Sequence, residues 1–356
     1  MCGLAAYRAA FTPAEARMTG RLIAAGFALA ACVAPAPGAQ APDAAAHVAA
    51  ARTAAGAEFL PLFDRLCVPP APSPAAPPAG RAAPATPARP TGPPPRSSWH
   101  ADPVKVFDNL YFIGQTEYSA WAVVTSAGVI VIDPLFDYSV ADEVVGGLET
   151  LGVDPAQIKY VVVSHGHSDH AGGAAFLQDR YQARVVVSAE DWDLMERTSG
   201  SWKKPRRDVV AKDGHHVTLG DTTLTLHQTP GHTLGTFSTI IPVRDGADRH
   251  TVAYWGGTAF NWLANRAGYI TKDRPDAFWF NQYIASAQRF RRIASDAGAD
   301  VLVSNHTAFD GSKTKLPMMA TRRAGDPHPY VIGAAGVARY LTVAEECALA
   351  GRARLK

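Results

Sequence analysis

The sequence predicts an α/β protein in which two β-sheets pack together and helices cover their outer faces. Short runs of β-branched and aromatic residues alternate with segments of helical periodicity, and turn residues separate them. About 258 residues follow Trp99, enough for two sheets with outer helices. The hydrophobic fraction of 47% and the charged fraction of 19% are typical of a globular protein with a sizeable core.

The N-terminal part contains two different kinds of segment. Residues 44–66 are rich in alanine and have apolar residues at helical spacing, which predicts a helix that begins near Asp43. Residues 69–95 hold twelve of the 27 prolines, mixed with small residues. Such a composition cannot bury a core and predicts an extended or disordered linker over residues 68–98.

The remaining elements follow in order from Trp99. Strands are predicted where β-branched runs lie between turn residues, and helices where the apolar period is close to 3.6. The predicted strands are residues 110–113, 120–125, 129–132, 160–163, 184–188, two within 217–228, 237–243, 251–255 and 301–303. The predicted helices are residues 139–151, 172–181, 190–197, 276–297 and 336–350.

The N-terminus resembles an export signal. Arginines flank Met18, a second candidate start beside Met1, and the apolar run that follows is too short to span a bilayer. The run ends in Leu-Ala-Ala-Cys at Cys32, which resembles a bacterial lipobox. Lipidation of Cys32 and ordinary cleavage near residues 39–41 are alternative predictions. Both place the mature protein in the periplasm or outside the cell, with a lipid anchor in the first case.

The cysteines indicate a possible disulfide, and the net charge indicates which class of molecule the protein binds. Outside the leader the cysteines are Cys67 and Cys347, which in an oxidising compartment can form a disulfide between the N-terminal segment and the last helix. Two free buried thiols are the alternative. The formal net charge is only +2, so we expect a small-molecule substrate and no nucleic-acid partner.

The densest chemical signal is the run His-Gly-His-Ser-Asp-His at residues 165–170, directly after the predicted strand 160–163. Imidazole and carboxylate groups together suit zinc and similar divalent ions. Four potential ligands exceed what one tetrahedral site takes when it keeps an open position. The spacing therefore predicts two neighbouring ions that share a bridging hydroxide.

This run resembles the H-x-H-x-D-H motif of the metallo-β-lactamase superfamily. The resemblance extends from about Val104 to His306: residues 129–133 match the family's strand that ends in aspartate, and residues 229–233 match its P-G-H-T loop. Residues 301–306 match the late strand that delivers the last histidine. The resemblance implies a four-layer αββα sandwich with a dinuclear site on one edge.

Six side chains are the metal ligands that the resemblance implies. His165, His167 and His232 form one site, and Asp169, His170 and His306 form the second. Asp169 would also orient the bridging hydroxide, as a catalytic residue, and Asp133 would orient the metal loop. Two zinc ions are the expected cofactors, with iron or manganese as alternatives.

The sequence departs from many members of the family at position 257, and this difference indicates a subclass of the superfamily. Glyoxalase II and the homoserine-lactone lactonases place an aspartate between the metals in a G-D-T segment, where this chain has Gly256-Gly257-Thr258. Neither ion can then gain a bridging carboxylate from position 257. This pattern resembles subclass B3 of the metallo-β-lactamases, which lacks that bridge.

The predicted function is zinc-dependent hydrolysis of an acyl bond, with the β-lactam amide as the favoured substrate and a role in antibiotic resistance. A lactonase, esterase or thioesterase with the same site is the alternative. Thr258, Tyr118, Ser119 and Asn305 are the candidate substrate-binding residues. The predicted organisation is a leader at 1–41, a helical segment at 42–67, the linker at 68–98 and a metallo-β-lactamase-fold domain at 99–356.

Overall fold

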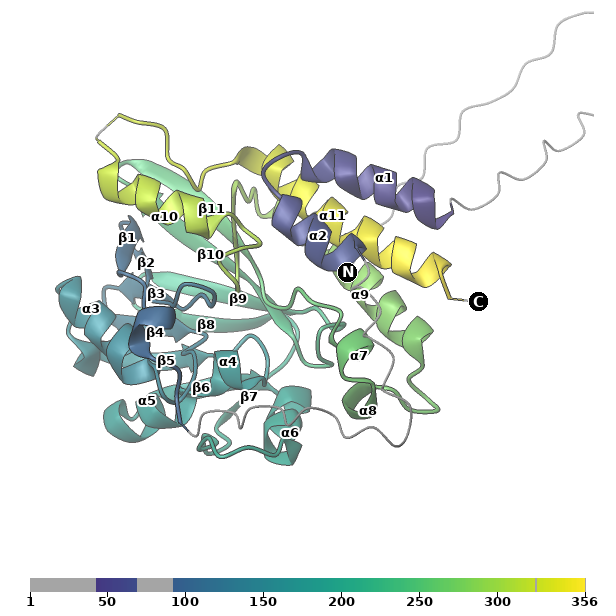
Figure 1. Cartoon of the computed structure of the whole chain (residues 1–356). Helices are drawn as coiled ribbons and strands as arrows, with labels where there is room; N and C mark the ends of the chain where they lie inside the picture. Colours follow the sequence, from purple (N-terminus) through teal and green to yellow (C-terminus); the bar gives the residue numbers. More distant parts are fainter. Residues whose placement is uncertain (1–42, 69–91, 324, 356) are drawn as a thin grey trace, which may run out of the picture. The chain divides into compact units, whose positions relative to one another are not determined.

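A computed structural model describes residues 43–68, 92–323 and 325–355. The predicted leader, with Met18 and Cys32, and most of the predicted linker lie outside the described residues. Two sheets and the helices on their outer faces account for most of the described chain (Figure 1).

The first sheet has seven strands in the order β1-β2-β3-β4-β5-β6-β7, and the second has five in the order β12-β11-β10-β9-β8. Strands β4 to β7 run parallel, as do β11 and β12, and the other neighbours are antiparallel. The strands are β1 (Val104–Phe107), β2 (Leu110–Phe112), β3 (Trp121–Thr125), β4 (Gly128–Ile132), β5 (Ile158–Val162), β6 (Arg184–Ser188), β7 (Val209–Ala211), β8 (His215–Leu219), β9 (Thr222–Gln228), β10 (Phe237–Asp245), β11 (Asp248–Trp255) and β12 (Val301–Ser304).

Three buried clusters lie between four layers. One joins the inner faces of the two sheets and contains Ile130 and Tyr254. A second joins the outer face of the first sheet to helices α3 to α6, and a third joins the outer face of the second sheet to α1, α2, α9 and α11. This arrangement confirms the predicted αββα sandwich. The helices are α1 (Ala44–Ala55), α2 (Leu60–Cys67), α3 (Gly146–Thr150), α4 (Ser168–Ala171), α5 (Ala174–Tyr181), α6 (Ala189–Arg197), α7 (Asn261–Ala264), α8 (Arg266–Tyr269), α9 (Asp276–Asp296), α10 (Ser312–Thr321) and α11 (Gly333–Ala353).

The predicted single helix over residues 44–66 is wrong in one respect, because the structure has two helices there. Asp43 caps α1 as expected, accepting a hydrogen bond from the Ala46 amide. The helix ends at Gly56, whose φ of 55° lies in the left-handed region that favours glycine. A proline in the first turn of α2 then starts a new helix.

Several short elements were not predicted. β1 and β7 are the two edges of the first sheet, and strands of three or four residues are too short to show a period. α10 contains Pro317, which normally argues against a helix. The predicted helix 139–151 begins as a π-helical turn, Val140–Val145, before α3.

The N-terminal helices belong to the same core as the C-terminal helix. α1 and α2 pack against α11, and Cys67 of α2 is joined to Cys347 of α11 by a disulfide. Both cysteines are buried. No helix in the part of the chain that the structure describes is both long and apolar enough to cross a membrane.

Replacing both Cys67 and Cys347 by alanine is expected to lower the free energy of unfolding by about 2–5 kcal/mol, because the bond closes a very long loop in the unfolded chain. The two cysteines are 280 residues apart. Urea unfolding followed by tryptophan fluorescence measures the loss. Reductant should reproduce it in the unmodified protein and have no effect on the double variant; alkylation of both thiols without reduction would contradict the disulfide.

Candidate metal centre

The predicted ligands lie where strands of both sheets end. The loop after β5 carries His165 and His167, the loop from β9 to β10 carries His232, and β12 ends just before His306. The Phe237 amide of β10 donates to the Ser164 carbonyl, at 2.8 Å, which joins the two sheets at this edge. The sheets therefore bring together residues that are far apart in the sequence.

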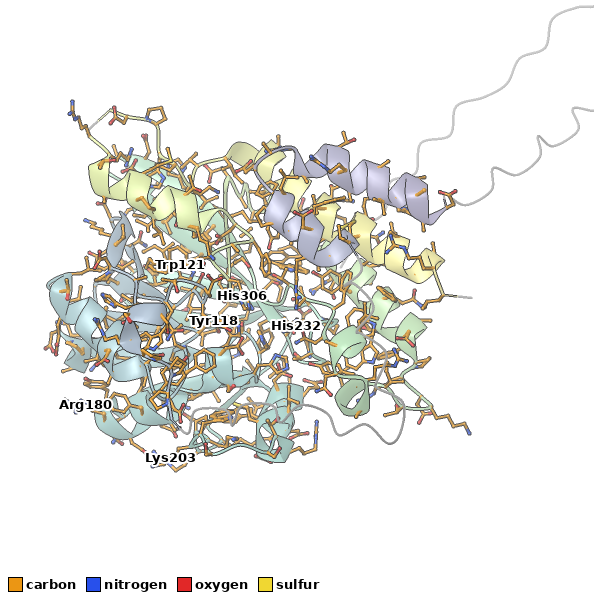
Figure 2. The ribbon with its side chains drawn as sticks, in the orientation of Figure 1. Tyr118, Trp121, Arg180, Lys203, His232 and His306 are labelled. Atoms are coloured by element: carbon orange, nitrogen blue, oxygen red, sulfur yellow. A yellow bond between two sulfur atoms is a disulfide. The ribbon has the colours of Figure 1, made fainter. Side chains whose placement is uncertain are left out.

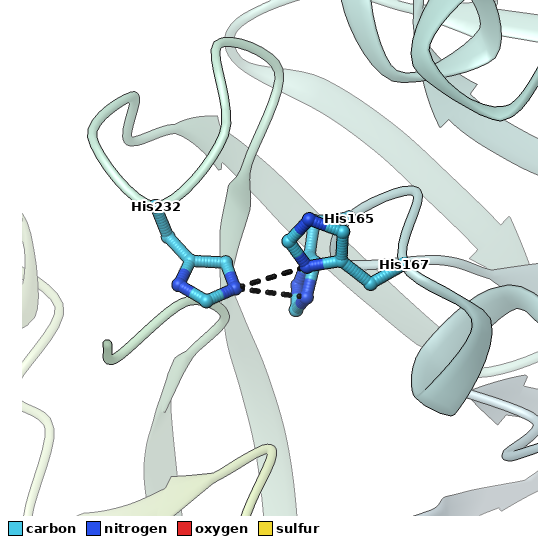
Figure 3. Close-up of side chains that lie close together, drawn as sticks. All are labelled: His165, His167 and His232. Atoms are coloured by element: carbon cyan, nitrogen blue, oxygen red, sulfur yellow. Dashed lines mark hydrogen bonds between the residues drawn. The ribbon is translucent and has the colours of Figure 1, made fainter. Parts of the chain in front are cut away.

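His165, His167 and His232 point their ring nitrogens at one place (Figure 3). His232 Nε2 lies 3.1 Å from His165 Nε2 and 3.2 Å from His167 Nδ1. This is the first of the two predicted groups.

The opposite nitrogen of each of these rings is engaged. His165 Nδ1 donates to the Gly256 carbonyl at 2.8 Å, and His232 Nδ1 donates to the Ala259 carbonyl at 2.7 Å. The Tyr269 hydroxyl lies 2.9 Å from His167 Nε2. The two carbonyls require a protonated Nδ1 on His165 and on His232, so the Nε2 lone pairs of these two rings face one another across 3.1 Å. A cation stabilises such an arrangement, so the residues fit a metal ion.

The second group differs slightly from the prediction. Asp169 and His170 have ligand atoms within 4.8 Å of those of His165, which makes a second possible metal group. His306 lies farther out, with Nε2 3.9 Å from Asp169 Oδ2, whereas His170 Nε2 is 3.2 Å from the same oxygen. The structure therefore brings all six predicted residues together, and it places His165 between the two groups.

Asp133 holds the metal loop as the sequence predicted. Its carboxylate accepts hydrogen bonds from the Ser164 amide at 2.7 Å, from the Ser164 hydroxyl at 2.6 Å and from Tyr254. His170 Nδ1 is 3.1 Å from Asp133 Oδ2, within ion-pair distance but without hydrogen-bond alignment. The residue is fully buried and has a φ of 54°, a conformation that aspartate tolerates better than most residues.

Burial and neighbouring charges set the protonation of the histidines. Burial lowers the pKa of His165 and His232 well below the usual value, which keeps both rings neutral, as metal ligands require. Burial, with help from the charges of His170 and Arg65, lowers the pKa of His306 to about 3. Burial also opposes protonation of His170, but Asp169 and Asp133 outweigh it and raise the pKa to about 10.

Two buried aspartates that the sequence analysis missed support the ligand loops. Asp191, in the first turn of α6, accepts hydrogen bonds from the Gly166 amide at 3.0 Å and from the Thr233 hydroxyl at 2.7 Å. It thereby joins the loop of His165 and His167 to the loop of His232. Asp310 accepts from the Ser304 amide at 2.7 Å, next to His306. Nothing in the local sequence marks Asp191, because its partners Gly166 and Thr233 are 25 and 42 residues away.

Helices α7 and α8 also contact the centre, which was not predicted either. Asn261 Nδ2 of α7 is 3.2 Å from His232 Nε2, and Tyr269 of α8 contacts His167. Aromatic rings of α9, including Trp279 and Phe280, pack against this segment. These rings therefore support α7 and α8 from the side of α9.

The candidate substrate residues lie near the centre with different exposure. Tyr118 is half-buried, and its ring centroid is 5.0 Å from that of His306 (Figure 2). Ser119, Thr258 and Asn305 are buried, and Asn305 donates its amide to the Gly256 carbonyl at 2.9 Å. Asn305 thus shares an acceptor with His165, which indicates a supporting contact. Substrate binding by these residues stays a prediction.

The basic loop at residues 203–207 lies away from the centre. Lys203 pairs with Asp179 at 2.6 Å, and in Figure 2 Lys203 and Arg180 lie at the edge of the molecule, far from His232 and His306. His100 and His250, which have no motif around them, pair with Glu143 and Asp300. These groups have structural partners of their own.

The comparisons with known proteins agree with this architecture. The model of the metallo-beta-lactamase superfamily matches residues 113–246. The chain is similar to BJP-1, a subclass B3 metallo-beta-lactamase of Bradyrhizobium japonicum, with 27% identity and a TM-score of 0.59 over 68% of this chain and 90% of that one.

The names of the curated relatives state activities other than that of a β-lactamase. A hydroxyacylglutathione hydrolase of Synechococcus sp. (strain CC9605) is 30% identical over 166 residues, 46% of this chain and 56% of that protein. The N-acyl homoserine lactonase AttM of Azorhizobium caulinodans is 27% identical over 195 residues, 49% of this chain and 67% of that protein. The first curated matches span about half of those proteins' length. The fold, the ligand geometry and the family model agree: the chain resembles the metallo-β-lactamase superfamily in its fold and over residues 113–246.

Proposed function

We propose that this protein is a zinc-dependent hydrolase, with two zinc ions, that cleaves an acyl C–N or C–O bond of a small molecule. The supporting observation is the convergence of His165, His167 and His232, each with its opposite nitrogen engaged, beside the pair of half-buried Asp169 and buried His170. Zinc at such a place supplies a Lewis acid and lowers the pKa of water toward neutrality.

The chain's own groups have separate tasks in this proposal. His165, His167 and His232 would hold the first ion. Asp169, His170 and His306 would hold the second, and His170 would lose its proton to solvent when that ion binds. Burial opposes ionisation of Asp169, but the charge of His170 and its hydrogen bond to the carboxylate outweigh burial and lower the pKa of Asp169, so Asp169 stays ionised. Its carboxylate can therefore accept and orient a proton of the attacking water. Among the four predicted substrate-binding residues only Tyr118 is not fully buried, so its ring is the one that a substrate can reach.

A β-lactam is the favoured substrate, because the chain resembles a subclass B3 structure and has Gly257 in place of a bridging aspartate. A lactone, ester or thioester is the second candidate, favoured by the names of the curated relatives. We also propose export to the periplasm or beyond, on the strength of the leader sequence.

The test is a substrate panel with the purified mature chain and zinc. We expect hydrolysis of a chromogenic cephalosporin or a carbapenem that stops on chelation and returns with zinc. Turnover of homoserine lactones or hydroxyacyl thioesters without any β-lactam turnover would replace the first candidate by the second. A zinc-loaded protein that hydrolyses none of them would contradict the proposed function.

A further inference from the structure

A cavity lies between the end of α2, helix α7 and the end of α11. Its volume is about 270 Å³, near the lower limit for pockets that hold small molecules. Within the described residues, five large apolar side chains are exposed by 40% or more, and three of them line this cavity: Val68, Leu263 and Leu355. Such a local concentration of exposed apolar surface indicates a binding site. Phe260 and Phe280 complete the apolar wall.

Two arginines line the same cavity. The guanidinium group of Arg354 donates only to the Cys67 carbonyl, at 3.4 and 3.5 Å. Neither Arg354 nor Arg65 has a carboxylate within ion-pair distance among residues 43–68, 92–323 and 325–355. Most other lining residues are apolar, and no acidic residue lines the cavity. A guanidinium group matches a carboxylate in shape and charge. Apolar walls with two guanidinium groups that have no carboxylate partner among the described residues therefore suit an amphiphilic anion.

The cavity adjoins the metal centre through α7. Phe260 and Leu263 line the cavity, whereas Asn261, between them in the chain, reaches His232. A molecule in the cavity would thus lie on the other side of a four-residue helix from the first metal group.

We propose that this cavity is a subsite for a carboxylate-bearing, medium-chain acyl compound, whose chain packs on α7 and whose carboxylate binds Arg65 and Arg354. The role of this cavity in holding a substrate rests on the proposed hydrolase function. Binding of such a compound in the cavity does not depend on that function. Charge complementarity identifies the ligand: an acyl amine would face two uncompensated cations, and a short acyl group would leave Val68, Leu263 and Leu355 exposed.

Octanoate is the probe, and isothermal titration calorimetry of the zinc-loaded mature chain is the measurement. We expect one octanoate per chain. Arg65→Gln and Arg354→Gln should each weaken binding about tenfold, the loss of one charge-assisted contact. Leu263→Ser should weaken it as well. The matched control is Arg323→Gln, which removes an exposed arginine that does not line this cavity and should leave binding unchanged.

Octylamine and octanol have an eight-carbon chain without the negative charge of octanoate. They therefore separate the contribution of the carboxylate from that of the apolar chain. Binding of octylamine as tight as that of octanoate, or equal binding by the unmodified chain and Arg65→Gln, would overturn the proposal. Unchanged binding in Leu263→Ser would do the same. A chain that binds octanoate through Arg65 but hydrolyses nothing contradicts the hydrolase function alone, whereas an active hydrolase that does not bind octanoate contradicts the subsite alone.

Discussion

Replacing His165 by alanine is expected to remove bound metal and to lower kcat/KM by about a thousandfold or more. His165 belongs to both possible metal groups, so its loss affects each of them. Its Nδ1 also holds the Gly256 carbonyl, at 2.8 Å, between the two sheets. Metal content by elemental analysis and steady-state kinetics on the best substrate measure the two effects.

Two other histidines provide the comparison for His165→Ala. His306→Ala should lower metal content less, because His306 lies at the outer side of the second group, 3.9 Å from Asp169. His216 is exposed on β8 and contacts only Thr225 through a side-chain hydrogen bond, so His216→Ala should change neither metal content nor kinetics. Unchanged metal stoichiometry in His165→Ala would refute the ligand assignment.

Introducing aspartate at position 257 is expected to impair the site rather than to supply a bridging ligand. A Cβ atom on Gly257 would lie 2.6 Å from His232 Cβ and 2.9 Å from Thr236 Cγ2. Both neighbours are buried, so any side chain at 257 must displace His232. We expect Gly257→Asp to weaken zinc binding about 10–100-fold, as loss of ligand support does elsewhere, with a matching fall in kcat/KM.

Gly257→Ala separates the steric effect from the charge. It adds the same Cβ without a carboxylate and should weaken zinc binding in the same direction, since the close contact with His232 is already present. Zinc titration against a chromophoric chelator measures both variants. Tighter zinc binding in Gly257→Asp, with Gly257→Ala neutral, would show that a carboxylate at 257 can bridge the metals in this fold.

The strand and helix content was largely predictable because the core elements carry long periodic signals. The buried strands β4 and β5 are nearly continuous apolar runs, and α9 and α11 are long enough to show their period. The edge strand β7 and the helix break at Gly56 depend on only a few residues. Short elements of that kind are decided by their neighbours in the fold.

The local sequence determined the ligand types, because His165, His167, Asp169 and His170 lie within six residues after a strand. The sequence also shows that position 257 is glycine and cannot supply a bridging carboxylate. The family resemblance pointed to His232 and His306 as ligands. Only the tertiary structure decided how these groups meet: His165 lies between both groups, and Asp191 joins two loops through a buried carboxylate. Only the tertiary structure also showed that α7 and α8 contact histidines of the first group and that a cavity adjoins α7. Such contacts join residues up to hundreds of positions apart. They depend on how the layers pack, and no periodic pattern in the sequence predicts them.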